Sequence, residues 1–319
     1  MKLKKIAIAL MAAATFGFCA NAEAAKDPKD IQIGFSVPQL ANPWFVGVKM
    51  GMDKACEELG IKCISIDAQY RVDKQLSDLE NMITAQYDAI FTTAIDANAL
   101  MATFEDAKKA GIVTGSIAQT VPNSNLVYGM DEYAYGKAIG TQAANWAKNT
   151  LKCKGKAALI TQDNVEAVKR RGDGIEDALK SICPEMELVA RQAGDNPSRG
   201  MAVIESVLQR HPDLNLVIAT NDSGGIGGYE AMVANGISGD DRAVFSGDAT
   251  REALALIQEP NSIYRGTVDL YPFKGGYESV KIMYDMIQNG IPEEQVTRML
   301  PYVEVPQADV LSGKYKATY

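Results

Sequence analysis

Short apolar stretches alternate with longer stretches of helical periodicity along almost the whole of this 319-residue chain. In the first pair, apolar residues at alternate positions of 31–37 predict a buried strand, and helical spacing over 45–59 predicts a helix that ends at Gly60. Strands separated by helices of about ten residues or more form parallel sheets with helices on both faces. The pattern runs twice, which predicts an α/β fold with two similar doubly wound lobes. The further strands expected are 62–67, 89–93, 112–117, 126–130, 157–161, 187–190, 214–220, 243–247 and 264–268, and the further helices are 73–84, 97–110, 134–150, 165–181, 198–209, 227–235, 251–258 and 273–288.

Residues 1–25 predict a cleavable signal peptide. A lysine-rich start precedes an apolar run over 6–18 that is too short to span a bilayer, and a small-x-small cleavage pattern ends at Ala24. A lipid anchor on Cys19 is the alternative, but Phe18 stands where a small residue is expected. We therefore expect export to the periplasm. A net charge of -8 with no basic block argues against a nucleic-acid partner.

Four cysteines follow the predicted signal peptide, and export permits disulfides. Cys56 lies near the end of the first predicted helix and Cys63 at the start of the next strand. Cys153 precedes a strand, and Cys183 follows the helix after that strand. This placement favours the pairs Cys56–Cys63 and Cys153–Cys183, with free buried thiols as the alternative. The spacing does not suit a metal site, and His211 is the single histidine.

Two aromatic residues follow the first predicted strand. Asn42 before Pro43 is typical of a capped helix start, so Trp44 and Phe45 come at the carboxyl end of the strand. Open α/β sheets bind ligands at that edge. The pair therefore predicts a stacked ligand, and burial of both rings in the core is the alternative.

Seven segments carry a resemblance to a known family: residues 41–60, 91–100, 128–140, 168–179, 219–232, 244–254 and 266–280. In this order and spacing they resemble the periplasmic sugar-binding proteins of the ribose-binding type, which share a fold with the ligand domains of the lactose-repressor family. The similarity covers essentially the whole chain after the predicted signal peptide. The signal peptide in place of a DNA-binding head favours the binding-protein branch.

The resemblance implies two lobes that are joined by three hinge crossings and close over a ligand. Lobe 1 would comprise 26–130 plus 271–301, and lobe 2 would comprise 131–270 plus 302–319. The resemblance further implies delivery of a small sugar or polyol to the membrane permease of an ABC importer. A periplasmic sensor subunit that presents its ligand to a membrane receptor is the alternative. We expect a monomer that needs no cofactor.

Ligand-binding residues are also implied by the resemblance, each beside a structural alternative. Asn42 matches a sugar-contacting amide and can cap its helix as well, and Trp44 and Phe45 match the aromatic pair of the family. Asn221 matches another amide, and Asp248 matches a pocket carboxylate that could instead cap the helix at Arg251.

Three further positions match the family less closely. Asp222 follows Asn221 and could cap the helix opened by residues 224–228. The family places an arginine in the pocket at a position that falls on Lys169, where lysine lacks the planar fork of arginine. Thr93 matches a polar position at a strand end. Solvated surface is the alternative for at least one of residues 169–171.

The lobe 1 side of the expected site departs from the aldose-binding pattern. Ile117 and Ala118 stand where the family usually has an adjacent Asp-Arg pair, Leu270 replaces a glutamine, and Met130 replaces a small polar residue. A more apolar pocket argues against simple transfer of ribose specificity. It leaves a sugar alcohol, a deoxy or branched sugar, or a small sugar-derived signal.

An enzyme is the main rival of a binding protein. The glycine-rich run 224–228 follows a strand and opens a helix, as a phosphate-binding loop does. It lacks the dinucleotide fingerprint, however, and no serine nucleophile-elbow motif occurs in the chain. His211 precedes Pro212 in an expected loop, which is more often a surface position than a catalytic one. We therefore expect no enzymatic activity.

Overall fold

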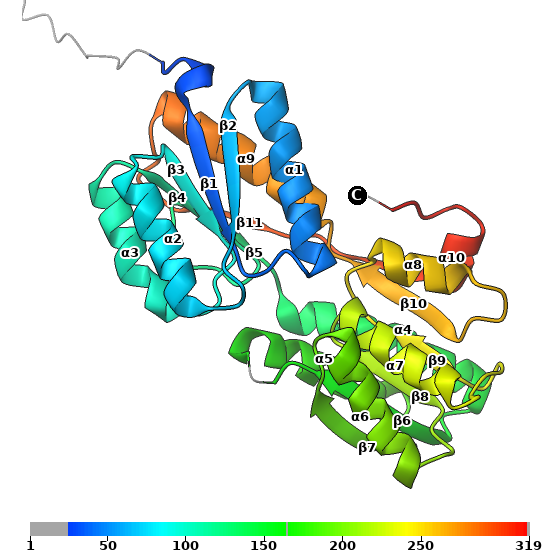
Figure 1. The fold of residues 1–319 in the computed structure, drawn as a ribbon. Coiled ribbons are helices and arrows are strands. Elements are labelled where there is room, and N and C mark those ends of the chain that lie inside the picture. The colour runs from blue at the N-terminus through cyan, green and yellow to red at the C-terminus, as the bar shows by residue number, and fades with distance from the viewer. Residues whose placement is uncertain (1–24, 164, 318–319) are drawn as a thin grey trace, which may run out of the picture.

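The computed structural model describes residues 25–163 and 165–317, which form two six-stranded sheets with helices on both faces (Figure 1). Residues 1–24 of the predicted signal peptide lie outside the described residues. None of the helices in the described ranges has the length and apolar character needed to cross a bilayer.

The first sheet has the order β11-β5-β4-β3-β1-β2, and all its neighbouring strands are parallel. Helices α1 and α9 pack together against one face, and α2 and α3 against the other. The elements along the chain are β1 (Gln32–Val37), α1 (Pro43–Leu59), β2 (Lys62–Asp67), α2 (Val72–Thr84), β3 (Ala89–Thr92), α3 (Ala97–Lys109), β4 (Val113–Ile117) and β5 (Leu126–Gly129), preceded by a short 3₁₀ turn, η1 (Pro28–Asp30).

The second sheet repeats this arrangement in the order β12-β10-β9-β8-β6-β7, where only the β12–β10 pair is antiparallel among the described strands. Helices α4 and α5 pack together, as do α6 and α7. The elements are α4 (Glu132–Leu151), β6 (Gly155–Thr161), α5 (Glu166–Ile182), β7 (Met186–Ala193), α6 (Pro197–Arg210), β8 (Leu216–Ala219), α7 (Asp222–Ala234), β9 (Ala243–Phe245), α8 (Arg251–Gln258) and β10 (Tyr264–Asp269).

The end of the chain returns to both sheets. After β10, α9 (Pro272–Asn289) and β11 (Val296–Met299) join the first sheet, and β12 (Val303–Pro306) and α10 (Gln307–Leu311) join the second. The chain therefore passes between the sheets after β5, after β10 and between β11 and β12 (Figure 1). The sequence pattern had not predicted β11, β12 or α10, because each element is short and lies against an existing sheet or helix.

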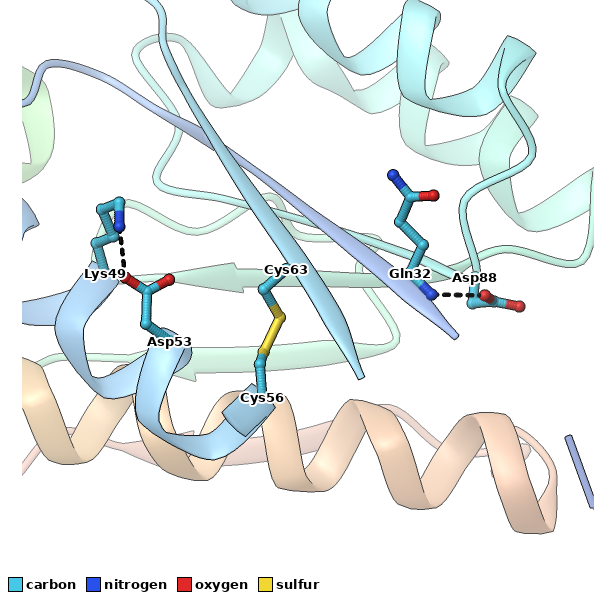
Figure 2. Close-up of a disulfide and its surroundings, with 6 residues drawn as sticks. All are labelled: Gln32, Lys49, Asp53, Cys56, Cys63 and Asp88. Atoms are coloured by element: carbon cyan, nitrogen blue, oxygen red, sulfur yellow. Dashed lines mark hydrogen bonds and ion pairs between the residues drawn. A yellow bond between two sulfur atoms is a disulfide. The ribbon is translucent and has the colours of Figure 1, made fainter. Parts of the chain in front are cut away.

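The two predicted cysteine pairs are confirmed. Cys56 and Cys63 join the end of α1 to the start of β2, with 6.1 Å between their Cα atoms (Figure 2). Cys153 and Cys183 join the segment before β6 to the end of α5, with 4.9 Å between Cα atoms. Gly60, at a φ of 68°, lets the chain reverse between the first two cysteines.

Helix α7 begins at Asp222, earlier than the start predicted at Gly227. Asn221 is its N-cap, because Asn221 Oδ1 accepts a hydrogen bond from the Gly224 backbone N–H at 2.9 Å. The glycines bring α7 close to α6: a Cβ atom at Gly227 would lie only 2.0 Å from the Pro197 carbonyl oxygen. Helix packing therefore explains the glycine run that also suggested a phosphate loop.

Candidate functional site

A cavity lies between the carboxyl ends of the two sheets. Many of its residues directly follow strands, as Pro38 follows β1, Ala118 follows β4 and Leu270 follows β10. The full lining is Pro38, Asn42, Trp44, Phe45, Tyr70, Ala94, Ile95, Ala118, Gln119, Met130, Gln162, Val165, Val168, Arg171, Asn221, Asp248 and Leu270. We call this the inner cavity, with a volume of about 60 Å³. It adjoins an outer cavity of about 750 Å³, since Ile95, Gln119 and Met130 line both.

The first sheet contributes aromatic and amide groups. Asn42 Oδ1 accepts a hydrogen bond from the Trp44 backbone N–H at 2.9 Å and so caps α1. Trp44 and Phe45 are 6% exposed and meet edge to face, with 5.3 Å between ring centroids. Within the described ranges, Trp44 Nε1 has no hydrogen-bond partner. An indole donor without a partner next to a cavity is available to a polar ligand.

The second sheet contributes the guanidinium of Arg171. Its Nε donates to Glu132 Oε2 at 2.7 Å, and its Nη1 donates to the Thr220 carbonyl oxygen at 2.9 Å. Its Cζ lies 4.9 Å from the centre of the Tyr135 ring. Burial lowers the pKa of Arg171, but Glu132, Tyr135 and Asp248 more than offset that effect and raise it above the ordinary value. Arg171 is therefore a fixed cation at the cavity wall.

Asp248 is the carboxyl group of the cavity wall and is 5% exposed. Burial raises the pKa of Asp248 well above its ordinary value, and the charge of Asp222 adds to this, while Arg171 acts in the opposite direction. Asp248 also has a φ of 119°, a left-handed conformation that costs energy in a non-glycine residue. Tyr70 and Ala118, at φ values of 57° and 60°, add two more strained positions to the lining.

Asp222 is fully buried and is not part of the lining. Its carboxylate accepts hydrogen bonds from the Thr250 backbone N–H at 2.7 Å and from Thr267 Oγ1 at 2.8 Å. Ser246 Oγ is a further donor. Burial raises the pKa of Asp222 to about 6, although these donors favour its charged form. The N-cap of α8 is Thr250 and not Asp248, so the Asp248 carboxyl group does not cap that helix.

Five of the eight predicted ligand residues meet at the inner cavity: Asn42, Trp44, Phe45, Asn221 and Asp248. Asp222, Thr93 and Lys169 lie elsewhere. Thr93 is fully buried, and its carbonyl oxygen accepts a hydrogen bond from Gln75 Nε2 at 2.9 Å. Lys169 is exposed on α5.

The cation that α5 contributes to the inner cavity is Arg171 rather than Lys169. Helical spacing explains the difference: Arg171 lies three residues after Val168, which also lines the cavity, so both are on one face. Lys169 is rotated away from that face. The i, i+3 relation to Val168 was therefore a sequence signal that could have identified Arg171.

Tyr70 and Gln162 also line the inner cavity, although the sequence pattern had not indicated them. Gln162 directly follows β6, and Tyr70 lies in the loop after β2. The rule that parallel strands present their carboxyl ends to a ligand could have indicated both. The described residues contain no group of three or more His, Cys, Asp and Glu side chains that could hold a metal ion.

The chain is similar in sequence to a known protein family. Residues 33–291 match the model of the periplasmic binding protein domain. The ribose import binding protein of Bacillus subtilis is 30% identical over 238 residues, which are 72% of this chain and 74% of that protein.

Two solved structures show the same fold. A periplasmic solute-binding protein of an ABC transporter from Actinobacillus succinogenes, with bound D-allose, superposes with a TM-score of 0.80 at 22% identity and covers 89% of this chain and 100% of its own. The Caulobacter myo-inositol binding protein, bound to myo-inositol, gives a TM-score of 0.77 at 22% identity and covers 89% and 97%. The protein therefore belongs to the periplasmic binding protein family.

Proposed function

We propose that this protein captures a small sugar or polyol in the inner cavity and delivers it to an ABC importer. The observation that carries the proposal is the meeting of aromatic, amide and charged side chains from both sheets at one cavity. Sugars and polyols combine hydroxyl groups with apolar C–H faces, so they need hydrogen-bonding side chains beside aromatic rings. The relatives named above bind ligands of this class.

Each wall has a separate role in the proposed site. Trp44 and Phe45 stack on an apolar face of the ring, while Asn42 and Asn221 exchange hydrogen bonds with hydroxyl groups. Asp248 and Arg171 hold further hydroxyl groups from the second sheet. Near Ala118, Met130 and Leu270 the wall offers mostly apolar groups. A sugar alcohol, a deoxy or branched sugar, or a sugar-derived signal fits this uneven distribution better than a fully hydroxylated aldose.

The proposed mechanism is closure of the two lobes about three hinge crossings. Lobe 1 is residues 26–130 plus 271–301, and lobe 2 is residues 131–270 plus 302–319. A ligand contacts residues of both lobes at once only when they are closed, so binding shifts the population toward closure. The closed monomer then presents both lobes to the membrane permease in the periplasm. We expect release of the ligand unchanged, without turnover.

A thermal-shift screen of residues 26–319 tests the function. The panel contains D-ribose, D-allose, deoxy sugars, myo-inositol and linear polyols, with amino acids and nucleosides as the contrast. A tight ligand raises the unfolding midpoint through binding linkage. X-ray scattering with and without the best ligand then tests closure, which should reduce the radius of gyration. A response to amino acids or nucleosides alone, or superimposable scattering profiles, would contradict the proposal.

A further inference from the structure

Glu132 stands at the first residue of α4, directly after the first passage between the sheets, and is 8% exposed. Its two carboxylate oxygens have different partners. Oε1 accepts a hydrogen bond from Gln119 Nε2 at 2.9 Å, and Oε2 accepts one from Arg171 Nε at 2.7 Å. Gln119 follows β4 of the first sheet and Arg171 belongs to α5 of the second. The buried Glu132 carboxylate thus binds one cavity side chain from the first sheet's part of the chain, Gln119, and one from the second sheet's part, Arg171.

Arg171 has a second carboxyl group within electrostatic reach, since Asp248 lines the same inner cavity and the two groups shift each other's pKa. In the described part of the chain, however, the ion pair of Arg171 is with Glu132 and none joins it to Asp248. The Nε atom is committed to Glu132 and an Nη1 hydrogen to Thr220. Arg171 is therefore held by Glu132 and the Thr220 carbonyl oxygen, without an ion pair to Asp248 in the described residues.

Removal of the Glu132 carboxylate would leave the Arg171 guanidinium without its ion-pair partner. A buried guanidinium without a counter-charge is strongly unfavourable, so it moves toward any carboxylate that it can reach. Asp248 is the candidate within the same cavity. An Arg171–Asp248 ion pair would occupy the guanidinium and the carboxyl group together, and both would be lost to a ligand.

We propose that Glu132 is a positioning residue that keeps Arg171 apart from Asp248 and thereby leaves the Asp248 carboxyl group free to bind the ligand. The binding arm of the test below rests on the proposed function, while the structural arm does not. Glu132 itself lines the outer cavity and is not part of the inner-cavity lining. It therefore acts through Arg171 and Gln119.

The structural arm uses the ligand-free protein. A crystal structure of Glu132→Ala should show a guanidinium nitrogen of Arg171 within about 4 Å of an Asp248 carboxylate oxygen. Glu132→Gln retains one acceptor oxygen and should show a mixture of both positions, and it serves if Glu132→Ala does not fold. The matched control is Glu166→Ala, an exposed acid at the same outer cavity. An Arg171 side chain that stays on Thr220 and Tyr135 in both Glu132 variants would overturn the proposal.

The binding arm is a double-mutant cycle with the panel member that stabilises the wild-type protein most. Glu132→Ala should weaken affinity by at least about tenfold, with partial rescue in Glu132→Gln and no loss in Glu166→Ala. Asp248→Asn should weaken ligand affinity at least about tenfold in the wild-type protein but less than about threefold in Glu132→Ala, because Asp248 is already paired with Arg171 in that variant. If the affinity losses of Glu132→Ala and Asp248→Asn are additive, Glu132 has a merely structural role and the proposal is overturned. Absence of binding by every sugar and polyol would instead reject the proposed function, and the crystal structures would still decide the role of Glu132.

Discussion

Gly136 lies directly against the backbone of Arg171: a Cβ atom at Gly136 would be only 1.9 Å from the Arg171 carbonyl oxygen. Real atoms do not approach so closely, so any larger residue at this position must push α4 and α5 apart. The same two helices carry Glu132, Tyr135 and Arg171, and the contacts of Glu132 and Tyr135 hold Arg171 at the cavity wall. A change in the packing of α4 against α5 therefore also changes the position of Arg171 at the cavity.

Gly136→Ala should accordingly lower the free energy of unfolding by about 1–3 kcal/mol, because the added methyl group overpacks the α4–α5 contact. It should also weaken ligand binding by moving Arg171. Denaturant unfolding and calorimetric titration would measure the two effects. Gly129→Ala is the control, since the nearest atom to its Cβ would be Met299 Sδ at 3.5 Å, an ordinary contact. Equal effects of the two substitutions would contradict this explanation.

Above the folded-state pKa of Asp248, Asp248→Asn should make the ligand-free protein more stable while it weakens binding. Because the folded-state pKa of Asp248 is raised, its ionised form costs folding stability, and this cost is fully present above the folded-state pKa. We expect a gain of about 1–3 kcal/mol in the free energy of unfolding above that pKa. As pH falls through that pKa, the wild-type carboxyl group becomes neutral and the gain should disappear.

Unfolding curves of Asp248→Asn and the wild-type protein from acidic to alkaline pH would measure this difference. Glu166→Gln should show no such pH dependence, since Glu166 is exposed. A stability difference between Asp248→Asn and wild type that stays constant across the range would speak against a buried carboxyl group at position 248 whose ionised form costs folding stability.

The chain has two tryptophans, and the structure assigns them different surroundings. Trp44 lines the inner cavity, while Trp146 lies in a separate groove of the second sheet, 6.3 Å from the Phe245 ring centroid. Ligand binding should therefore change the fluorescence of Trp44. Trp44→Phe should abolish most of the ligand-induced change, and Trp146→Phe should retain it. A full response from Trp44→Phe would place the ligand away from the aromatic pair.

Loss of the two disulfides should destabilise the protein unequally. Cys153–Cys183 spans 30 residues and Cys56–Cys63 spans 7. Closure of the longer loop removes more conformational entropy from the unfolded chain. Loss of Cys153–Cys183 should therefore lower the free energy of unfolding by about 3–4 kcal/mol, and loss of Cys56–Cys63 by about 2–3 kcal/mol. Double serine substitution of each pair, followed by denaturant unfolding, would measure both values. A larger loss from the Cys56–Cys63 pair would show that local packing outweighs loop entropy.

Much of the fold follows from local patterns. Short apolar stretches between helical segments identified the strands from β1 to β10, and the placement of four cysteines around two helix–strand units identified both disulfide pairs. Such signals succeed because strand and helix periodicity are properties of consecutive residues. The elements β11, β12 and α10 escaped detection because sheets assembled from earlier parts of the chain stabilise them.

The sequence by itself determined the fold class, the cysteine pairs, and a set of polar and aromatic residues at strand ends, among them Asn42, Trp44 and Asp248. Tertiary structure decided which of them share the cavity. It placed Asp222 in a fully buried hydrogen-bond cluster, turned Lys169 to the surface and brought Arg171 to the wall beside Glu132. The physical reason is that side-chain direction on a helix and the meeting of groups more than a hundred positions apart depend on packing between elements, which local periodicity does not encode.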